Sequence, residues 1–257
     1  MLDVVLPLLF AVFVWWFSTG LILWLVGMPR RLHRRALFGA TLVLVLALIG
    51  LAGSSRVSSV AAAYCAFSCA LLVWGWQELA FLLGVVTGPR RLPCPPGVAG
   101  WRRAWLALQT LLHHEAALIV LGLAVLATSW DQPNQTGWWT YLILWVMRQS
   151  AKLNVFLGVR NLNEHFLPQH LQYLQTYFTR RPMNALLPIS LLLATLAVIP
   201  MWQHVSAAAD GSFEATSWAL AASLLSLAIL EHVLLVLPLN ADALWRWALR
   251  TDGVTRG

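Results

Sequence analysis

The sequence predicts an all-α, polytopic membrane protein with seven transmembrane helices and one amphipathic helix at the membrane interface. Two observations predict this fold class. Hydrophobic residues make up 60% of the 257 residues and charged residues only 11%, whereas a soluble domain carries about 25% charged residues. The hydrophobic residues also fall into runs of about 20, which is the length that an α-helix needs to cross the hydrocarbon core of a bilayer.

The hydrophobic runs form one integral membrane domain, 1–257, because no internal repeat or low-complexity tract divides the chain. The N-terminal MLDVVLPLLF lacks the basic region and the small-residue cleavage site of a signal peptide, so we expect it to begin the first span. The predicted spans are about 4–27, 36–53, 60–88, 104–130, 138–159, 185–204 and 218–240.

The basic residues lie mainly between spans, on one side of the membrane. The segments 28–35 and 89–103 each hold four arginines, and seven spans place both on the same side and Arg56 on the other. The positive-inside rule then puts the N-terminus in the periplasm and the C-terminus in the cytoplasm. The same rule accounts for the net charge of +7, so this charge does not indicate a nucleic-acid partner.

The segment after the fifth span has the pattern of an amphipathic helix at about 166–180. Apolar residues recur at helical spacing, glutamines lie elsewhere on the helical wheel, and Pro168 suits a first helical turn. Such a helix lies at the membrane surface. Two roles are open, a connector that covers the end of the bundle or a docking surface for a partner. The residues of the docking surface would be Phe166, Leu167, Leu171, Leu174 and Phe178.

Ionisable residues inside the predicted spans form a polar layer. Each lies about 8 to 12 residues from the cytoplasmic end of its span, or roughly 12 to 18 Å at 1.5 Å per residue. A cation in hydrocarbon costs about 3 kcal/mol on insertion scales, so Arg148 and Lys152 should each face a carboxylate. The layer consists of Glu78, His113, His114, Glu115, Arg148, Lys152, Glu231 and His232.

The polar layer has a structural and a functional interpretation. The structural one is a network of ion pairs and hydrogen bonds that fixes helix packing. The functional one is a site for iron, manganese or zinc, a proton relay, or a histidine that ligates the magnesium of a chlorin pigment. Neighbouring residues on a helix point about 100° apart and the Glu-x-x-His spacing of di-iron bundles is absent, which weakens the metal hypothesis. The candidate metal ligands are His113, His114, Glu115, Glu231 and His232.

Several blocks spread over nearly the whole chain resemble the PuhE family of purple phototrophic bacteria. They include FSTGLILWL near Phe17, AYCAFSCALLVWGWQELAFLLGVVTGPRRLPCPPG from Ala63, LHHEAAL from Leu112, LWVMRQSAKLNVFLGVRNLNEHFLPQHLQYLQTYFTRRPMN from Leu144 and LEHVLLVLPL from Leu230. The resemblance implies a multi-pass protein of the bacterial inner membrane, cytoplasmic or intracytoplasmic. It implies a role in assembling the reaction centre and core light-harvesting complex or in regulating bacteriochlorophyll supply, and supplies no catalytic residue.

Three hypotheses for function follow from the sequence. The first is a non-enzymatic assembly factor whose partners are the lipid bilayer and either the photosynthetic reaction centre and core light-harvesting proteins or enzymes of bacteriochlorophyll biosynthesis. The second is a metal-dependent oxidoreductase acting on a pigment precursor, with a metal ion in the polar layer. The third is a protein that binds a quinone or a bacteriochlorophyll-type pigment.

Overall fold

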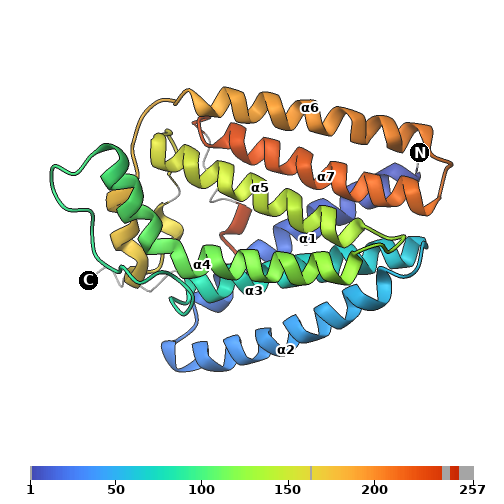
Figure 1. Cartoon of the computed structure of the whole chain (residues 1–257), viewed down its shortest axis with the longest axis horizontal. Helices are drawn as coiled ribbons and strands as arrows, with labels where there is room; N and C mark the ends of the chain where they lie inside the picture. The colour runs from blue at the N-terminus through green and yellow to red at the C-terminus, as the bar shows by residue number, and fades with distance from the viewer. Residues whose placement is uncertain (1, 163, 239–243, 249–257) are drawn as a thin grey trace.

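The protein is a long helical bundle in the computed structural model, which describes residues 2–162, 164–238 and 244–248. The described residues form seven α-helices and two 3-10 helices. The α-helices run along the length of the molecule, and the 3-10 helices lie at one end (Figure 1). The elements are α1 (Leu2–Val26), α2 (Arg30–Ser54), α3 (Val60–Leu82), α4 (Gly100–Ser129), α5 (Thr136–Leu157), η1 (Glu164–Phe166), η2 (Gln169–Tyr177), α6 (Leu186–Ala207) and α7 (Phe213–Leu234).

Helices α3 and α7 form the centre of the bundle. Helix α3 packs against α1, α2, α4, α5 and α7, and α7 packs against α1, α3, α5 and α6. Their buried faces are rich in small residues, such as Ala63, Ala66 and Ala70 on α3 and Ala219 and Ala222 on α7. Small residues let helix backbones approach closely, which is how helices associate in a membrane.

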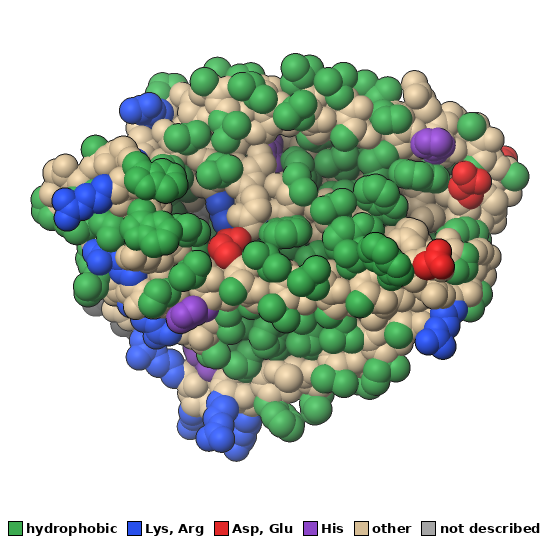
Figure 2. Space-filling view, in the orientation of Figure 1, with side chains coloured by type: hydrophobic (Ala, Val, Ile, Leu, Met, Phe, Trp, Pro, Cys, Tyr) green, Lys and Arg blue, Asp and Glu red, His purple; other side chains and the backbone are tan. Residues whose placement is uncertain are grey.

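The outer surface of the bundle is hydrophobic. Large apolar side chains cover the face seen in Figure 2, and leucines on α1, α2 and α6, such as Leu6, Leu46 and Leu193, are more than half exposed. Six helices, α1–α4, α6 and α7, are long and apolar enough to cross a membrane. The chain is therefore a multi-pass membrane protein whose exposed leucines suit contact with lipid.

Helix α5 is as long as α6 and α7, at 22 residues, but it does not reach the hydropathy of the other six. Its second half carries Arg148, Lys152 and Asn154 among apolar residues. It lies alongside α4 and α7 in Figure 1, and packs against α3, α4 and α7.

Two central helices end earlier than predicted. Helix α3 ends at Leu82 rather than near 88, because Gly84 has a positive φ of 76° and the N–H of Val85 bonds the carbonyl of Ala80 at 3.0 Å, a Schellman motif. Helix α7 ends at Leu234, and the end of its predicted span, 239–240, lies outside the described residues.

These helix ends correct the predicted depth of the polar layer. Glu78 lies one turn from the end of α3, and Glu231 and His232 lie in the last turn of α7. The expected distance of 8 to 12 residues from the end of the helix is therefore wrong for these three residues. The short helices leave room at this end of the bundle, which the segments after α3, α5 and α7 occupy.

The predicted amphipathic helix at about 166–180 is present in part, as 3-10 rather than α-helical turns. The segment forms the short 3-10 helix η1 and the longer η2. Leu171, Leu174 and Tyr177 are the buried residues of η2, and their spacing of three matches the three residues per turn of a 3-10 helix. Its apolar side therefore faces the bundle, as the connector interpretation requires.

Candidate functional site

The structure pairs Arg148 and Lys152 of α5 with carboxylates on other helices. The guanidinium Nη2 of Arg148 donates to Glu78 Oε2 on α3 at 2.8 Å. Lys152 Nζ donates to Glu115 Oε1 on α4 at 2.7 Å, and Gln149 Nε2 donates to the other oxygen of Glu115 at 2.6 Å. The prediction that each cation faces an acid is confirmed, and the two ion pairs join three helices.

The third acid of the layer, Glu231 on α7, has a different partner. Its Oε1 accepts a hydrogen bond from the indole Nε1 of Trp15 on α1 at 2.7 Å. Arg148 is close enough to interact with it electrostatically, although no ion pair joins them among the described residues. Sequence reasoning missed Trp15. Its place in the middle of α1 was the signal that it contacts something inside the bundle.

The three histidines of the layer do not converge. His114 is buried against the ring of Phe81, with ring centroids 4.7 Å apart, whereas His113 is on the exposed side of α4. His232 Nε2 lies 2.9 Å from Ser150 Oγ on α5. Neighbouring positions on a helix point in different directions, so His113 and His114 cannot serve one centre.

The described residues contain no group of three His, Cys, Asp or Glu side chains that could hold a metal ion. The candidate ligands are instead engaged elsewhere. Glu115 is bound by Lys152 and Gln149, Glu231 by Trp15, and the imidazole of His232 lies between Ser150 and the carbonyl of Ala228. Among the described residues, the geometry therefore does not bring the candidate ligands named from the sequence together as a set of three.

The charged residues instead line a cavity of about 470 Å³ between α1, α3, α4, α5 and α7. Cavities of about 300 to 1,000 Å³ with mainly apolar walls and a few polar groups are typical of ligand sites. Most of this wall is apolar, and its charged members are Glu78, Arg148, Lys152 and Glu231. Figure 2 shows acidic and basic side chains beside a hollow within the hydrophobic face over α4 and α5.

The segment η1–η2 closes one end of this cavity. Phe166, Leu167, Leu174 and Phe178 all line it, which gives the apolar side of the segment an internal role. Leu171, which is 1% exposed, and Leu174, at 5%, face the bundle. The docking surface proposed from the sequence is therefore not available to a partner at these two leucines.

Hydrogen bonds fix η2 to the segments around it. Arg90 Nε donates to the hydroxyl of Tyr177 at 2.8 Å, and that hydroxyl donates to the carbonyl of Leu92 at 3.1 Å. Arg103 Nη2 donates to the carbonyl of Tyr177 at 2.5 Å and to Thr179 Oγ1 at 2.7 Å. Arg90, between α3 and α4, and Arg103, in the first turn of α4, thus hold the cover of the cavity in place.

The C-terminal segment 244–248 folds back onto α1 beside the same cavity. The indole of Trp245 donates to the carbonyl of Trp16 at 3.1 Å, and the indole of Trp16 donates to the carbonyl of Leu244 at 2.8 Å. Trp245 lines the cavity, and its ring meets Trp15 edge-on at 5.5 Å and Phe166 at 6.2 Å. An aromatic cluster from α1, η1 and the C-terminal segment therefore borders the site where Trp15 binds Glu231.

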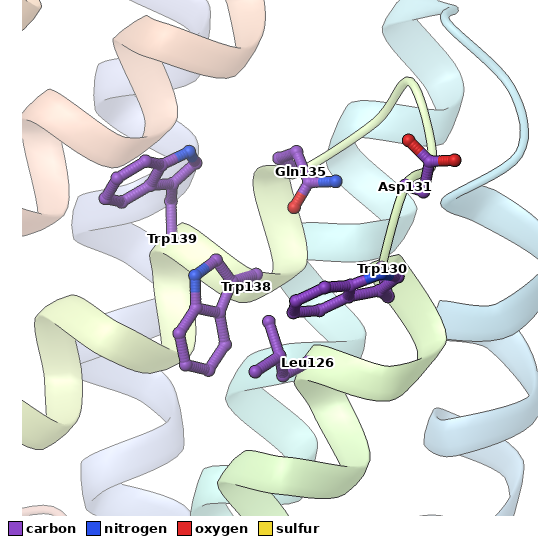
Figure 3. A pocket seen from close by; sticks show the side chains of 6 residues that line it. All are labelled: Leu126, Trp130, Asp131, Gln135, Trp138 and Trp139. Atoms are coloured by element: carbon purple, nitrogen blue, oxygen red, sulfur yellow. The ribbon is translucent and has the colours of Figure 1, made fainter.

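A second pocket, of about 420 Å³, lies at the turn between α4 and α5. In Figure 3, Trp130 and Trp138 lie on either side of Leu126, and Trp139 points away from them. Asp131 and Gln135 complete the lining. Clustered tryptophans at a helix turn suit the membrane–water interface, and the pocket brings no reactive group together.

The fold and the cavity define an all-helical, multi-pass membrane protein with ion pairs in the wall of an interior site. The chain belongs to the family described as "Protein of unknown function (DUF3623)", whose profile matches residues 1–255. It is 42% identical, over 244 residues, to an uncharacterized 30.4 kDa protein in the puhA 5′ region of Rhodobacter capsulatus. The match covers 93% of this chain and 88% of that protein. No solved structure matches the chain.

Proposed function

We propose that this protein is an integral membrane factor of the bacterial photosynthetic system. It acts, on this proposal, in assembly of the reaction centre and core light-harvesting complex or in regulation of bacteriochlorophyll supply. The observation that carries the proposal is the relative in the puhA 5′ region, because puhA is a gene of the photosynthetic reaction centre. The resemblance to the PuhE family points the same way, and the bacterial inner membrane is the corresponding location.

A clean deletion in a phototrophic host tests this role. We expect the deletion strain to lose near-infrared absorption from bacteriochlorophyll complexes while its aerobic growth is unchanged, because a factor of the photosynthetic system is dispensable for respiration. The measurement is the absorption spectrum of isolated membranes, with a strain complemented by the intact gene as control. Unchanged absorption in the deletion strain would refute the proposal.

The proposal includes α5 as a seventh span, with the N-terminus in the periplasm and the C-terminus in the cytoplasm. At 1.5 Å per residue, the 22 residues of α5 measure roughly 33 Å, enough to cross the hydrocarbon core. The ion pairs of Arg148 and Lys152 remove the obstacle that two bare cations would present. A phosphatase reporter that needs export, fused after Gly257, should be inactive; activity would contradict this topology.

The cavity favours a second candidate function, binding of a pigment or a quinone. Its volume, its apolar wall and its four charged residues are those of a ligand site rather than of a closed packing core. Binding and assembly are compatible, since a factor that delivers or senses a small molecule can serve the assembly of a larger complex. Extraction of the purified protein with organic solvent, followed by a visible absorption spectrum, tests whether a pigment is bound.

A further inference from the structure

We propose that the cavity binds a neutral amphipathic molecule, with an apolar body and a polar head that carries a carbonyl or hydroxyl oxygen, as a quinone head group does. The inference deepens the second candidate function and rests on it. It follows from three features of the cavity, namely a hydrogen-bond donor exposed to its interior, charges of both signs in its wall, and aromatic side chains at its border.

The exposed donor is Arg148. Its side chain keeps 47% of its surface accessible, whereas its partner Glu78 keeps 11%. Arg148 lies in the second half of α5 and lines the cavity, so this accessible surface faces the interior site. A guanidinium has five N–H donors, and the described residues engage one of its nitrogens, through the bond to Glu78. The remaining donors need an oxygen acceptor in the cavity.

The charges of the wall exclude a ligand with a net charge. An anion bound to Arg148 would also face Glu78 and Glu231, which both interact electrostatically with that arginine. A cation near Glu231 would face Arg148, and Lys152 lies in the same wall. Like charges that lie close together in a medium of low dielectric constant repel strongly. A neutral carbonyl or hydroxyl oxygen accepts from Arg148 without this repulsion.

Glu231 and the aromatic border specify the rest of the ligand. Glu231 holds Trp15 through one carboxyl oxygen and lines the cavity, so the second oxygen is in position to accept from a hydroxyl head. Trp15, Trp74 and Trp245 also line the cavity. Flat aromatic side chains pack well against a flat ring, and the apolar remainder of the wall suits a hydrocarbon body.

The test compares two probes that share a tail and differ in their head, a decyl-substituted benzoquinone and decanoate. The measurement is the saturable binding of each probe to the full chain in lipid nanodiscs. The amount of probe that partitions into empty nanodiscs is subtracted as background. We expect the quinone to bind and decanoate to bind at least tenfold more weakly. Glu231→Gln keeps an acceptor for Trp15 and removes one negative charge from the cavity wall, so it should raise decanoate affinity severalfold.

Two matched variants locate the binding. Ala151 lines the cavity on the turn between Arg148 and Lys152, so Ala151→Phe should fill space and lower quinone affinity at least tenfold. Ala116 on α4 is exposed on the outer surface, so Ala116→Phe adds the same side chain without this effect. Absence of saturable quinone binding, equal loss in both variants, or tighter binding of decanoate than of quinone would each overturn the inference.

The outcome is separable from the test of the photosynthetic role. Quinone binding in nanodiscs together with unchanged near-infrared absorption in a deletion strain would support the ligand class and refute the photosynthetic role. Loss of absorption in the deletion strain together with no quinone binding by the intact chain would refute the ligand class alone.

Discussion

Removal of Arg148 should destabilise the bundle mainly by leaving Glu78 without its counter-ion. Breaking a buried ion pair from one side costs about 3 to 5 kcal/mol in soluble proteins. Because nearly half of the Arg148 side chain is accessible, the pair is only partly buried, and we expect Arg148→Met to cost about 2 to 3 kcal/mol. The matched double variant, Arg148→Met with Glu78→Gln, strands neither charge and should recover at least half of that loss.

The assay heats the purified protein in detergent and measures, at each temperature, the fraction of protein that stays monodisperse. For a chain of this size, 1 kcal/mol corresponds to roughly 2 to 4 °C in Tm, so the single variant should unfold at least 4 °C earlier than the native protein. Recovery should be specific to Glu78, since Glu115 is held by Lys152 and Glu231 by Trp15. Equal rescue of Arg148→Met by Glu115→Gln or Glu231→Gln, or no rescue by Glu78→Gln, would refute the assigned pair.

Two further predictions concern packing at the edges of the cavity. Gly20→Ala should displace the C-terminal segment, because a Cβ at Gly20 would lie 2.1 Å from Trp247 Cζ2. Gly39→Ala, whose Cβ meets nothing within 4 Å, is the control. Limited proteolysis of the C-terminus distinguishes the two variants, and equal cleavage would contradict the packing of Trp247 on Gly20. Leu171→Glu should prevent the chain from folding to a monodisperse protein, because the Leu171 side chain is 1% exposed. Gln172→Glu, at the exposed next position, should fold normally. Normal insertion and stability of Leu171→Glu would show that η2 does not cover the bundle.

The presence of ion pairs could be predicted from the sequence, but not the choice of partners. Two cations four residues apart on one helix require carboxylates, and only three were available inside the spans. Which acid meets which cation depends on the axial register of α3, α4 and α7 against α5, and that register is set by small-residue packing along whole helices. Spacing within one helix therefore predicts a shared face, whereas the partner across the interface is a property of the assembled bundle.

The errors at the end of the bundle that η1 and η2 cover share a physical cause. Apolar residues continue past Leu82 and Leu234, so hydropathy alone extends both spans, although Gly84 carried a local signal for the end of α3. The segment after Pro168 was assigned the period of an α-helix, while its buried residues recur every three positions. Hydropathy reports whether a segment is apolar, and the caps and the period decide whether it stays helical.

The cavity and the charges in its wall together argue for a function that packing alone does not explain. Buried ion pairs can often be replaced by apolar residues with no loss of stability, and an empty cavity costs packing energy. A bundle selected only for stability would therefore not combine buried ion pairs with an empty cavity. Here two central helices stop short, and η2 and Trp245 close the space without filling it, so the groups of Glu78, Arg148 and Glu231 remain at its surface. A ligand that occupies the space would restore the lost contacts and engage the exposed donors, which is the physical reason to expect one.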